Sequence, residues 1–173
     1  AAESGIRRKI FCASLADVFE DRPELEPWRY DLLNLIINTP RLDWLVLTKR
    51  PENVSRMIEQ ATGRVAGAWL ADCNHVWIGA SVEDQEAADK RIPHLLKVDA
   101  KVRFLSCEPM LGPIDLDAPW PDTVHSRDFA AQLDWVIVGG ESGPKHRAFD
   151  PAWACSIVAQ CADADVACFV KQM

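Results

Sequence analysis

Six short apolar runs, spaced like the strands of repeated strand–helix units, are the feature that most constrains the fold of this chain. The runs end at residues 14, 48, 81, 106, 139 and 170, so successive ends lie 25 to 34 residues apart. This spacing is close to the size of one βα unit with its loops. The runs hardly alternate with polar residues, which is typical of parallel strands covered on both faces. The sequence therefore predicts an α/β fold with about six parallel strands.

Helical patterns fill most of the intervals between the runs. Residues 28–38 form the first predicted helix, and its expected core face consists of Trp28, Leu32, Leu35 and Ile36. A second helix begins at Pro51, a favoured first helical residue. The third follows Asp84 and contains Pro93, which we expect to kink or divide it. The fourth begins after Asp150, a capping residue followed by proline.

Two architectures fit alternating strands and helices: an open doubly wound sheet and a partial (β/α) TIM-type barrel. A complete eight-stranded barrel commonly needs about 250 residues, more than the 173 of this chain. Polar residues follow all six runs, which favours a barrel mouth over a sheet whose site gathers at one switch point. We therefore expect one domain over residues 1–173, a truncated barrel, with the proline-rich interval 112–132 as a long loop or insertion.

Bulk composition narrows the function classes. The formal net charge of −7 and the pI near 5.1 argue against sequence-independent binding to a nucleic acid backbone, which needs clustered Lys and Arg. No apolar stretch approaches the roughly 18 residues that span a bilayer, and the first residues lack the apolar core of a signal peptide. We expect a cytoplasmic protein outside the membrane. Its six cysteines lack CxxC pairing, so we expect reduced thiols and no metal site.

The residues directly after each run are the candidate site, because the carboxyl ends of parallel strands meet at one edge, where α/β proteins bind ligands. Polar strand ends also arise where strands simply emerge into solvent, and this alternative stays open. The glycine-rich turn at 139–143 is neither GxGxxG nor a Walker loop, so it does not by itself predict nucleotide binding. Cys107 follows the fourth run without a nearby His, which favours a packed thiol over a nucleophile.

Candidate roles follow from the charges at the strand ends. Carboxylates suit an ammonium or amino-acid-like ligand, whereas basic residues and a glycine-rich turn suit a carboxylate or phosphate. The candidate catalytic residues, able to act as acid–base pairs, are Lys49, Glu108 and Lys171. The candidate cofactor-binding residues are Glu83, Gly139, Gly140, Glu141 and Ser142. The candidate substrate-binding residues are Asp17, Arg50 and Arg147.

Five motifs follow one another along the chain: Phe11–Phe19, Trp44–Pro51, Trp77–Glu83, Phe104–Gly112 and Trp135–Gly143. Together they resemble the phage-related proteins grouped as phage gene products 37 and 68, a largely uncharacterised family. The resemblance spans the chain from about Lys9 to Met173. It implies a partial barrel whose mouth, in a complete protein, binds cofactor and substrate.

The resemblance also implies a cofactor chemistry. Longer members of that family are similar to radical S-adenosylmethionine enzymes and carry a Gly-Cys stretch and a Cys-x-x-Cys that would ligate an iron–sulfur cluster. None of the six cysteines here matches that motif. We therefore expect a barrel that lacks its first strand or strands and is inactive in that chemistry on its own. S-adenosylmethionine and the cluster are expected for a full-length relative, and no cofactor is assigned to this chain with certainty.

Three hypotheses for the function remain open. The leading one is the cofactor- and substrate-binding part of a radical S-adenosylmethionine-like barrel enzyme that acts on an unknown substrate, a nucleic acid or a protein. The second is a non-catalytic phage accessory protein that binds a partner or an anion. The third is a metal-independent barrel enzyme that uses a carboxylate with Lys49 or Lys171 as an acid–base pair. An exposed sheet edge also predicts association into a homo-oligomer.

Overall fold

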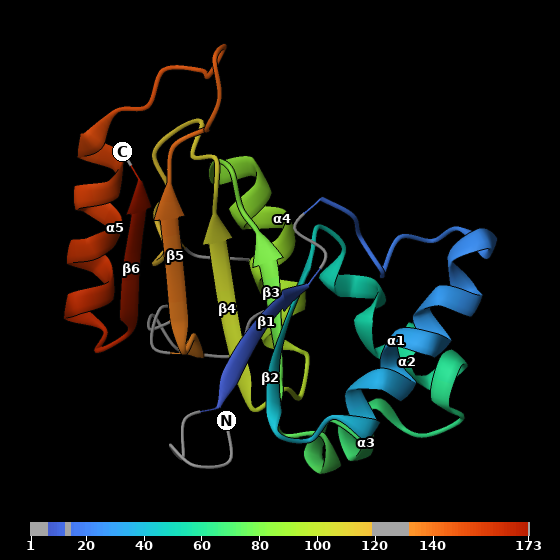
Figure 1. Cartoon of the computed structure of the whole chain (residues 1–173). Coiled ribbons are helices and arrows are strands. Elements are labelled where there is room, and N and C mark those ends of the chain that lie inside the picture. Colours follow the sequence, from blue (N-terminus) through green and yellow to red (C-terminus); the bar gives the residue numbers. More distant parts are fainter. Residues whose placement is uncertain (1–6, 13–14, 119–131, 173) are drawn as a thin grey trace.

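Six parallel strands form one sheet that curves into a half-barrel, with helices between the strands (Figure 1). The computed structural model describes residues 7–12, 15–118 and 132–172. Neighbouring strands in the sheet are also neighbours in the sequence, and every pair is parallel. The strands are β1 (Arg8–Cys12), β2 (Leu42–Thr48), β3 (Val76–Ser81), β4 (Val102–Cys107), β5 (Trp135–Gly139) and β6 (Ala167–Gln172). The predicted fold class and the six predicted strands are therefore confirmed.

Within the described residues, five α-helices connect the strands and cover the convex side of the sheet (Figure 1). They are α1 (Glu26–Asn38), α2 (Val54–Thr62), α3 (Ala66–Asp72), α4 (Gln85–Leu96) and α5 (Pro151–Asp163). Short 3₁₀ turns at Pro23–Leu25 and Pro51–Asn53 lead into α1 and α2. Asp84 and Asp150 cap α4 and α5 by accepting backbone N–H bonds. These caps fix where each chain segment leaves the strand end and turns into a helix.

The predicted core face of α1 is correct for Ile36, which is buried, and for Leu32, which packs against the core, but wrong for Trp28 and Leu35. Trp28 is 70% exposed and Leu35 is 49% exposed, whereas Arg29, Leu33 and Ile36 are the buried residues. The guanidinium of Arg29 donates to the carbonyl oxygens of residues 18 and 20, at 2.8 and 3.0 Å. Burial lowers the pKa of Arg29 from its ordinary value. These bonds compensate the buried charge and leave part of the expected face exposed.

Pro93 does not divide α4, which is one continuous helix from Gln85 to Leu96. A proline removes a single backbone hydrogen bond within the helix. Ile92, Pro93 and Leu95 are all buried against the core, and this packing keeps the helix together across the missing bond. Between α2 and β3 lies α3, a short helix for which no expectation followed from the sequence.

The two faces of the sheet carry separate apolar clusters. The larger cluster fills the space between the sheet and the helices. The smaller one lies on the opposite, concave face and consists of Leu45, Leu47, Phe104 and Ile137, with Trp77 and Trp135 packed against it. The ring of Phe104 lies across β3 at Gly79, where a Cβ atom would come within 2.3 Å of it. The concave face is the floor of the site described below.

The edge strands of the half-barrel are β1 and β6. The predicted loop at 112–132 is described only in part: residues 112–118 contain no helix or strand, and residues 119–131 lie outside the described part of the chain. Ile114 and Leu116 are buried there, because Gln160 of α5 bonds to the backbone of both residues. No helix within the described residues combines the length and apolarity that a membrane crossing requires.

Candidate functional site

A cavity of about 660 Å³ opens at the carboxyl ends of the strands. Its volume falls in the range typical of small-molecule sites. Six of the predicted site residues line it, namely Lys49, Glu108, Gly140, Glu141, Ser142 and Lys171. They follow or end strands β2, β4, β5 and β6, so the parallel topology brings together residues that lie far apart in the sequence. Below them the wall is apolar and includes Leu47, Trp135 and Ile137.

Two smaller cavities adjoin the first. One of about 380 Å³ is lined by the predicted residues Lys49, Glu83 and Arg147, and another of about 250 Å³ by Asp17 and Lys49. Lys49 lines all three cavities. Arg50 and Gly139 line none of them. Lys49 therefore lies where the three cavities meet.

Glu83 anchors Lys49. Its Oε1 accepts a hydrogen bond from Lys49 Nζ at 2.5 Å, and its Oε2 accepts one from Arg91 at 2.6 Å. Burial alone would raise the pKa of Glu83, but the hydrogen bonds and charges of Lys49 and Arg91 outweigh it and hold this pKa below its usual value. Glu83 is therefore a carboxylate at neutral pH, and it fixes one cation at the cavity rim.

Glu108 and Lys171 form a second charged pair on the other side of the cavity. Lys171 Nζ lies 3.3 Å from Glu108 Oε1. A Cβ atom at position 139 would lie 2.8 Å from this same oxygen, so Gly139 leaves the space that the Glu108 side chain occupies. Position 139, a candidate for cofactor binding, thus has a packing role in placing Glu108. The pair presents one anionic and one cationic group to the same cavity.

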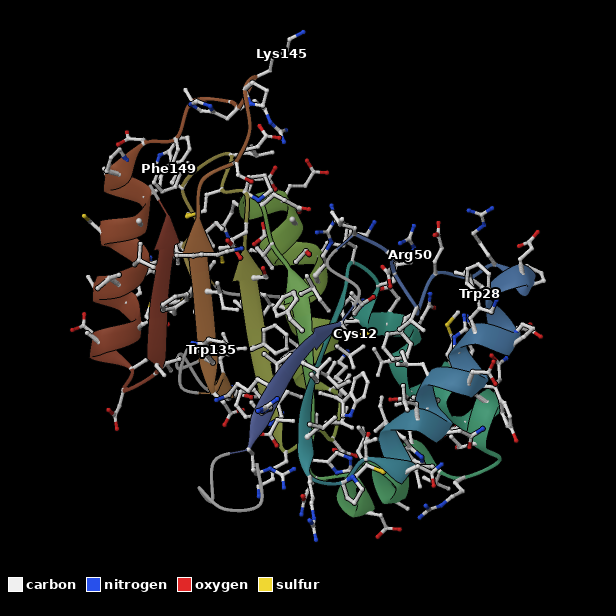
Figure 2. The ribbon with its side chains drawn as sticks, in the orientation of Figure 1. Cys12, Trp28, Arg50, Trp135, Lys145 and Phe149 are labelled. Atoms are coloured by element: carbon white, nitrogen blue, oxygen red, sulfur yellow. The ribbon has the colours of Figure 1, made fainter. Side chains whose placement is uncertain are left out.

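Glu141 and Arg147 form a bidentate pair across the loop between β5 and α5. Arg147 Nε and Nη2 donate to the two carboxylate oxygens of Glu141 at 2.9 and 2.8 Å, and the Arg147 backbone N–H donates at 2.8 Å. The side-chain and backbone hydrogen bonds from Arg147 lower the pKa of Glu141 to about 2. Lys145 projects at the tip of this loop, and Phe149 lies where the loop returns to α5 (Figure 2). Arg147 therefore holds the loop next to the mouth.

Asp17, predicted to contact substrate, is also held by hydrogen bonds from the surrounding chain. Its two carboxylate oxygens accept bonds from the Thr48 hydroxyl, the backbone N–H groups of Phe19 and Lys49, and the Arg50 guanidinium, at 2.7 to 3.0 Å. Arg50 also donates to Glu20 at 3.1 Å. These bonds occupy both side chains and tie the segment after β1 to the end of β2. Asp17 and Arg50 are therefore positioning residues for Lys49.

Other residues of the cavity were not assigned to the site from the sequence. The hydroxyl-bearing Ser81 and Ser106, paired in register on β3 and β4, are buried and line it. Phe11 and Phe169, on the two edge strands, line it as well. The sequence pattern that could have identified them is the period of two along a strand, which places every second residue of a run on the concave face. Ser81 and Ser106 end the third and fourth runs and belong to the polar strand ends, but they were given no role. Phe11 and Phe169 lie within their runs and were not considered.

The cysteines of this chain differ in their burial. Cys73, Cys107 and Cys161 are buried, whereas Cys155 is exposed. Burial raises the pKa of the Cys107 thiol well above its usual range, in agreement with a packed thiol. Within residues 7–12, 15–118 and 132–172, no group of three or more His, Cys, Asp or Glu side chains could hold a metal ion. The described side chains therefore do not fit an iron–sulfur cluster.

Comparison with known proteins gives one match. A family model described as a protein of unknown function, DUF5131, matches residues 2–173. No curated protein and no solved structure matches this chain.

Proposed function

The chain belongs to the DUF5131 family of unknown function, and on this premise we propose that its half-barrel is the cofactor- and substrate-binding part of a radical S-adenosylmethionine-like enzyme. The observation that carries the proposal is the single cavity of about 660 Å³ on which residues from the ends of four strands converge. Ligand sites of barrel enzymes lie at this end of the strands.

The chemistry of the rim fits the amino acid end of S-adenosylmethionine. This molecule carries an ammonium group and a sulfonium, which carboxylates attract, and a carboxylate, which lysines attract. Glu108 supplies an anionic group of the cavity, and Lys49 and Lys171 supply cationic ones. Glu141 also lines the cavity, but Arg147 binds both of its carboxylate oxygens. When bound, the cofactor would supply an activated carbon–sulfur bond. Because the described side chains do not fit a cluster, the proposal assigns binding to this chain and no reductive step.

Isothermal titration with S-adenosylmethionine and with S-adenosylhomocysteine, which lacks the sulfonium charge, tests the proposal. We expect both to bind, with Glu108→Gln and Lys171→Met each weakening S-adenosylmethionine about tenfold or more, since a hydrogen bond to a charged group contributes about 1.5–3 kcal/mol. The matched controls are Glu24→Gln and Lys97→Met, exposed residues that line none of the three cavities. Controls should bind like the wild type.

Two results would overturn this assignment. The first is a wild-type chain that binds neither compound. The second is binding that the Glu108 and Lys171 variants leave unchanged. Binding of an inorganic anion at Lys49 and Lys171 without any affinity for S-adenosylmethionine would instead support a non-catalytic binding protein.

A further inference from the structure

Three aromatic residues, Phe11, Trp135 and Phe169, line the lower wall of the large cavity, and further rings pack beneath them. Phe11 packs edge-on against Phe104, with ring centroids 6.1 Å apart and planes at 61°, and Phe104 contacts Trp135 at 6.0 Å. Trp135 in turn packs at right angles against Trp77 at 6.0 Å. These rings come from strands β1, β4, β5 and β3, so they form one continuous surface on the concave face of the half-barrel. This surface lies beneath the charged rim.

Two rings of this wall are not covered by the protein. Phe104 is fully buried, but Phe11 is 41% exposed and Phe169 is 51% exposed. Both line the large cavity, Phe11 from edge strand β1 and Phe169 from edge strand β6. Phe169 pairs in register with Ile137, a member of the concave-face cluster, so its side chain belongs to the same face. The cavity is thus flanked by an open aromatic ring on each of its two sides.

Polar groups lie within this aromatic wall. Ser81 and Ser106 are 5% and 3% exposed and line the cavity between the edge strands. A hydroxyl can both donate and accept hydrogen bonds. Ser106 Oγ donates to Glu108 at 3.5 Å, whereas a purely aliphatic ligand would offer the Ser81 hydroxyl no hydrogen-bond partner, at a cost in free energy. A planar ring that carries nitrogen and oxygen atoms would offer this hydroxyl a partner while its faces contact the phenylalanines.

We propose that the cavity binds a nucleobase-bearing ligand of nucleoside size, whose ring lies against Phe11 and Phe169 and whose polar end reaches the rim at Lys49 and Lys171. Bases of every kind stack on aromatic side chains. The cavity volume suits a small molecule, and the net charge of −7 opposes binding to a long polynucleotide backbone. The inference deepens the proposed function and rests on it, because it names the class of compound that occupies the same cavity.

Adenosine, which carries no amino acid and no charge, is the probe, and ribose, which lacks the nucleobase, is the control compound. Isothermal titration should show saturable binding of adenosine and none of ribose. Phe11→Leu and Phe169→Leu should each weaken adenosine at least about fivefold, as expected for loss of a stacking contact. Phe169→Tyr keeps the ring and should bind like the wild type, as should Trp28→Leu, which changes an exposed aromatic on α1.

A second measurement does not depend on how the leucine variants fold. Adenosine should quench tryptophan fluorescence, and Trp135→Phe, which keeps an aromatic ring in the wall, should remove most of this quenching. Absence of saturable adenosine binding to the wild type overturns the proposal. So do folded leucine variants that bind adenosine as tightly as the wild type, and quenching that persists in Trp135→Phe.

A competition experiment shows whether the nucleobase bound by the aromatic wall belongs to the cofactor or to a substrate. If adenosine displaces S-adenosylhomocysteine, the aromatic wall holds the adenine of the cofactor. If both bind together, the wall holds the base of a substrate. Either result supports the proposed ring site. A chain that binds adenosine through Phe11 and Phe169 but has no affinity for S-adenosylmethionine would refute the proposed function and leave this inference standing.

Discussion

Gly79→Ala tests the packing of the concave face. The new Cβ would lie 2.3 to 2.5 Å from three atoms of the Phe104 ring, closer than real Cβ atoms approach other atoms. The ring cannot swing away easily, because it is fully buried and contacts both Phe11 and Trp135. Alanine in this strand therefore requires a shift of the whole aromatic wall.

The size of the effect follows from two opposing terms. Overpacking of a well-packed core costs about 1–3 kcal/mol. Replacing glycine with alanine restricts the unfolded chain and returns about 0.4–1 kcal/mol where the backbone allows it. We expect a net loss of about 1–2 kcal/mol in the free energy of unfolding, and a fall of about 2–8 °C in the Tm of a chain this long.

Urea denaturation followed by circular dichroism measures this loss. Gly112→Ala is the control, because its nearest contact would be 3.8 Å away, and its effect should stay within about 0.5 kcal/mol. Phe104→Leu shortens the obstructing side chain, so the double variant with Gly79→Ala should lose at least about 0.5 kcal/mol less than the sum of the single losses. A Gly79→Ala protein as stable as the wild type, or strictly additive losses, would show that the ring does not lie over Gly79.

Three further predictions concern the site. Asp17→Asn removes the charge that Arg50 and two backbone N–H groups bind, and urea denaturation should show a loss of about 1–3 kcal/mol. The pKa of Glu83 is lower in the folded state than in the unfolded state. As pH falls, the Glu83 carboxylate is therefore protonated in the unfolded state at a higher pH than in the folded state. The wild type should exceed Glu83→Gln in free energy of unfolding by its full amount near pH 7, and this difference should shrink below about pH 4.5. Urea denaturation curves recorded at each pH measure it. Iodoacetamide should alkylate the exposed Cys155 in the native protein and leave Cys107 unmodified until it unfolds, as peptide mass spectrometry would detect.

The strands were predictable from the sequence because parallel strands buried on both faces require continuous apolar runs. The runs that end at residues 48, 81 and 139 coincide with the ends of β2, β3 and β5. Deviations occur at the edges: the first run was placed about two residues too late, and residues 13–14 lie outside the described part of the chain. Edge strands are partly solvated, so their composition defines their bounds less sharply.

The face of α1 could be predicted only in part, since this helix carries large apolar residues on several sides, Trp28, Tyr30, Leu35 and Ile37 among them. The orientation depends on Arg29 and its bonds to backbone carbonyls, which no periodicity reveals. The same limit applies to the aromatic wall. In β6, Cys168 and Phe169 are neighbours in an uninterrupted apolar run, and only the sheet register shows that Phe169 belongs with Ile137 on the concave face.

The sequence predicted where the candidate site lies better than it predicted the role of each residue in it. Lys49, Glu108, Glu141, Ser142 and Lys171 do line one cavity. Residue type and order gave no means of telling a ligand-facing group from a positioning group. Asp17 and Glu108 are both acids after a strand, yet four internal hydrogen bonds occupy the first, whereas the second faces the cavity.

Hydrogen–deuterium exchange with and without S-adenosylhomocysteine tests the central claim most directly, that the cavity at the strand ends is the binding site. Our account predicts slower exchange in peptides that contain Glu141 and Ser142, and in those that contain Lys171, with no change in α1 or α3. Protection confined to the helices, or no protection at saturating ligand, would contradict it.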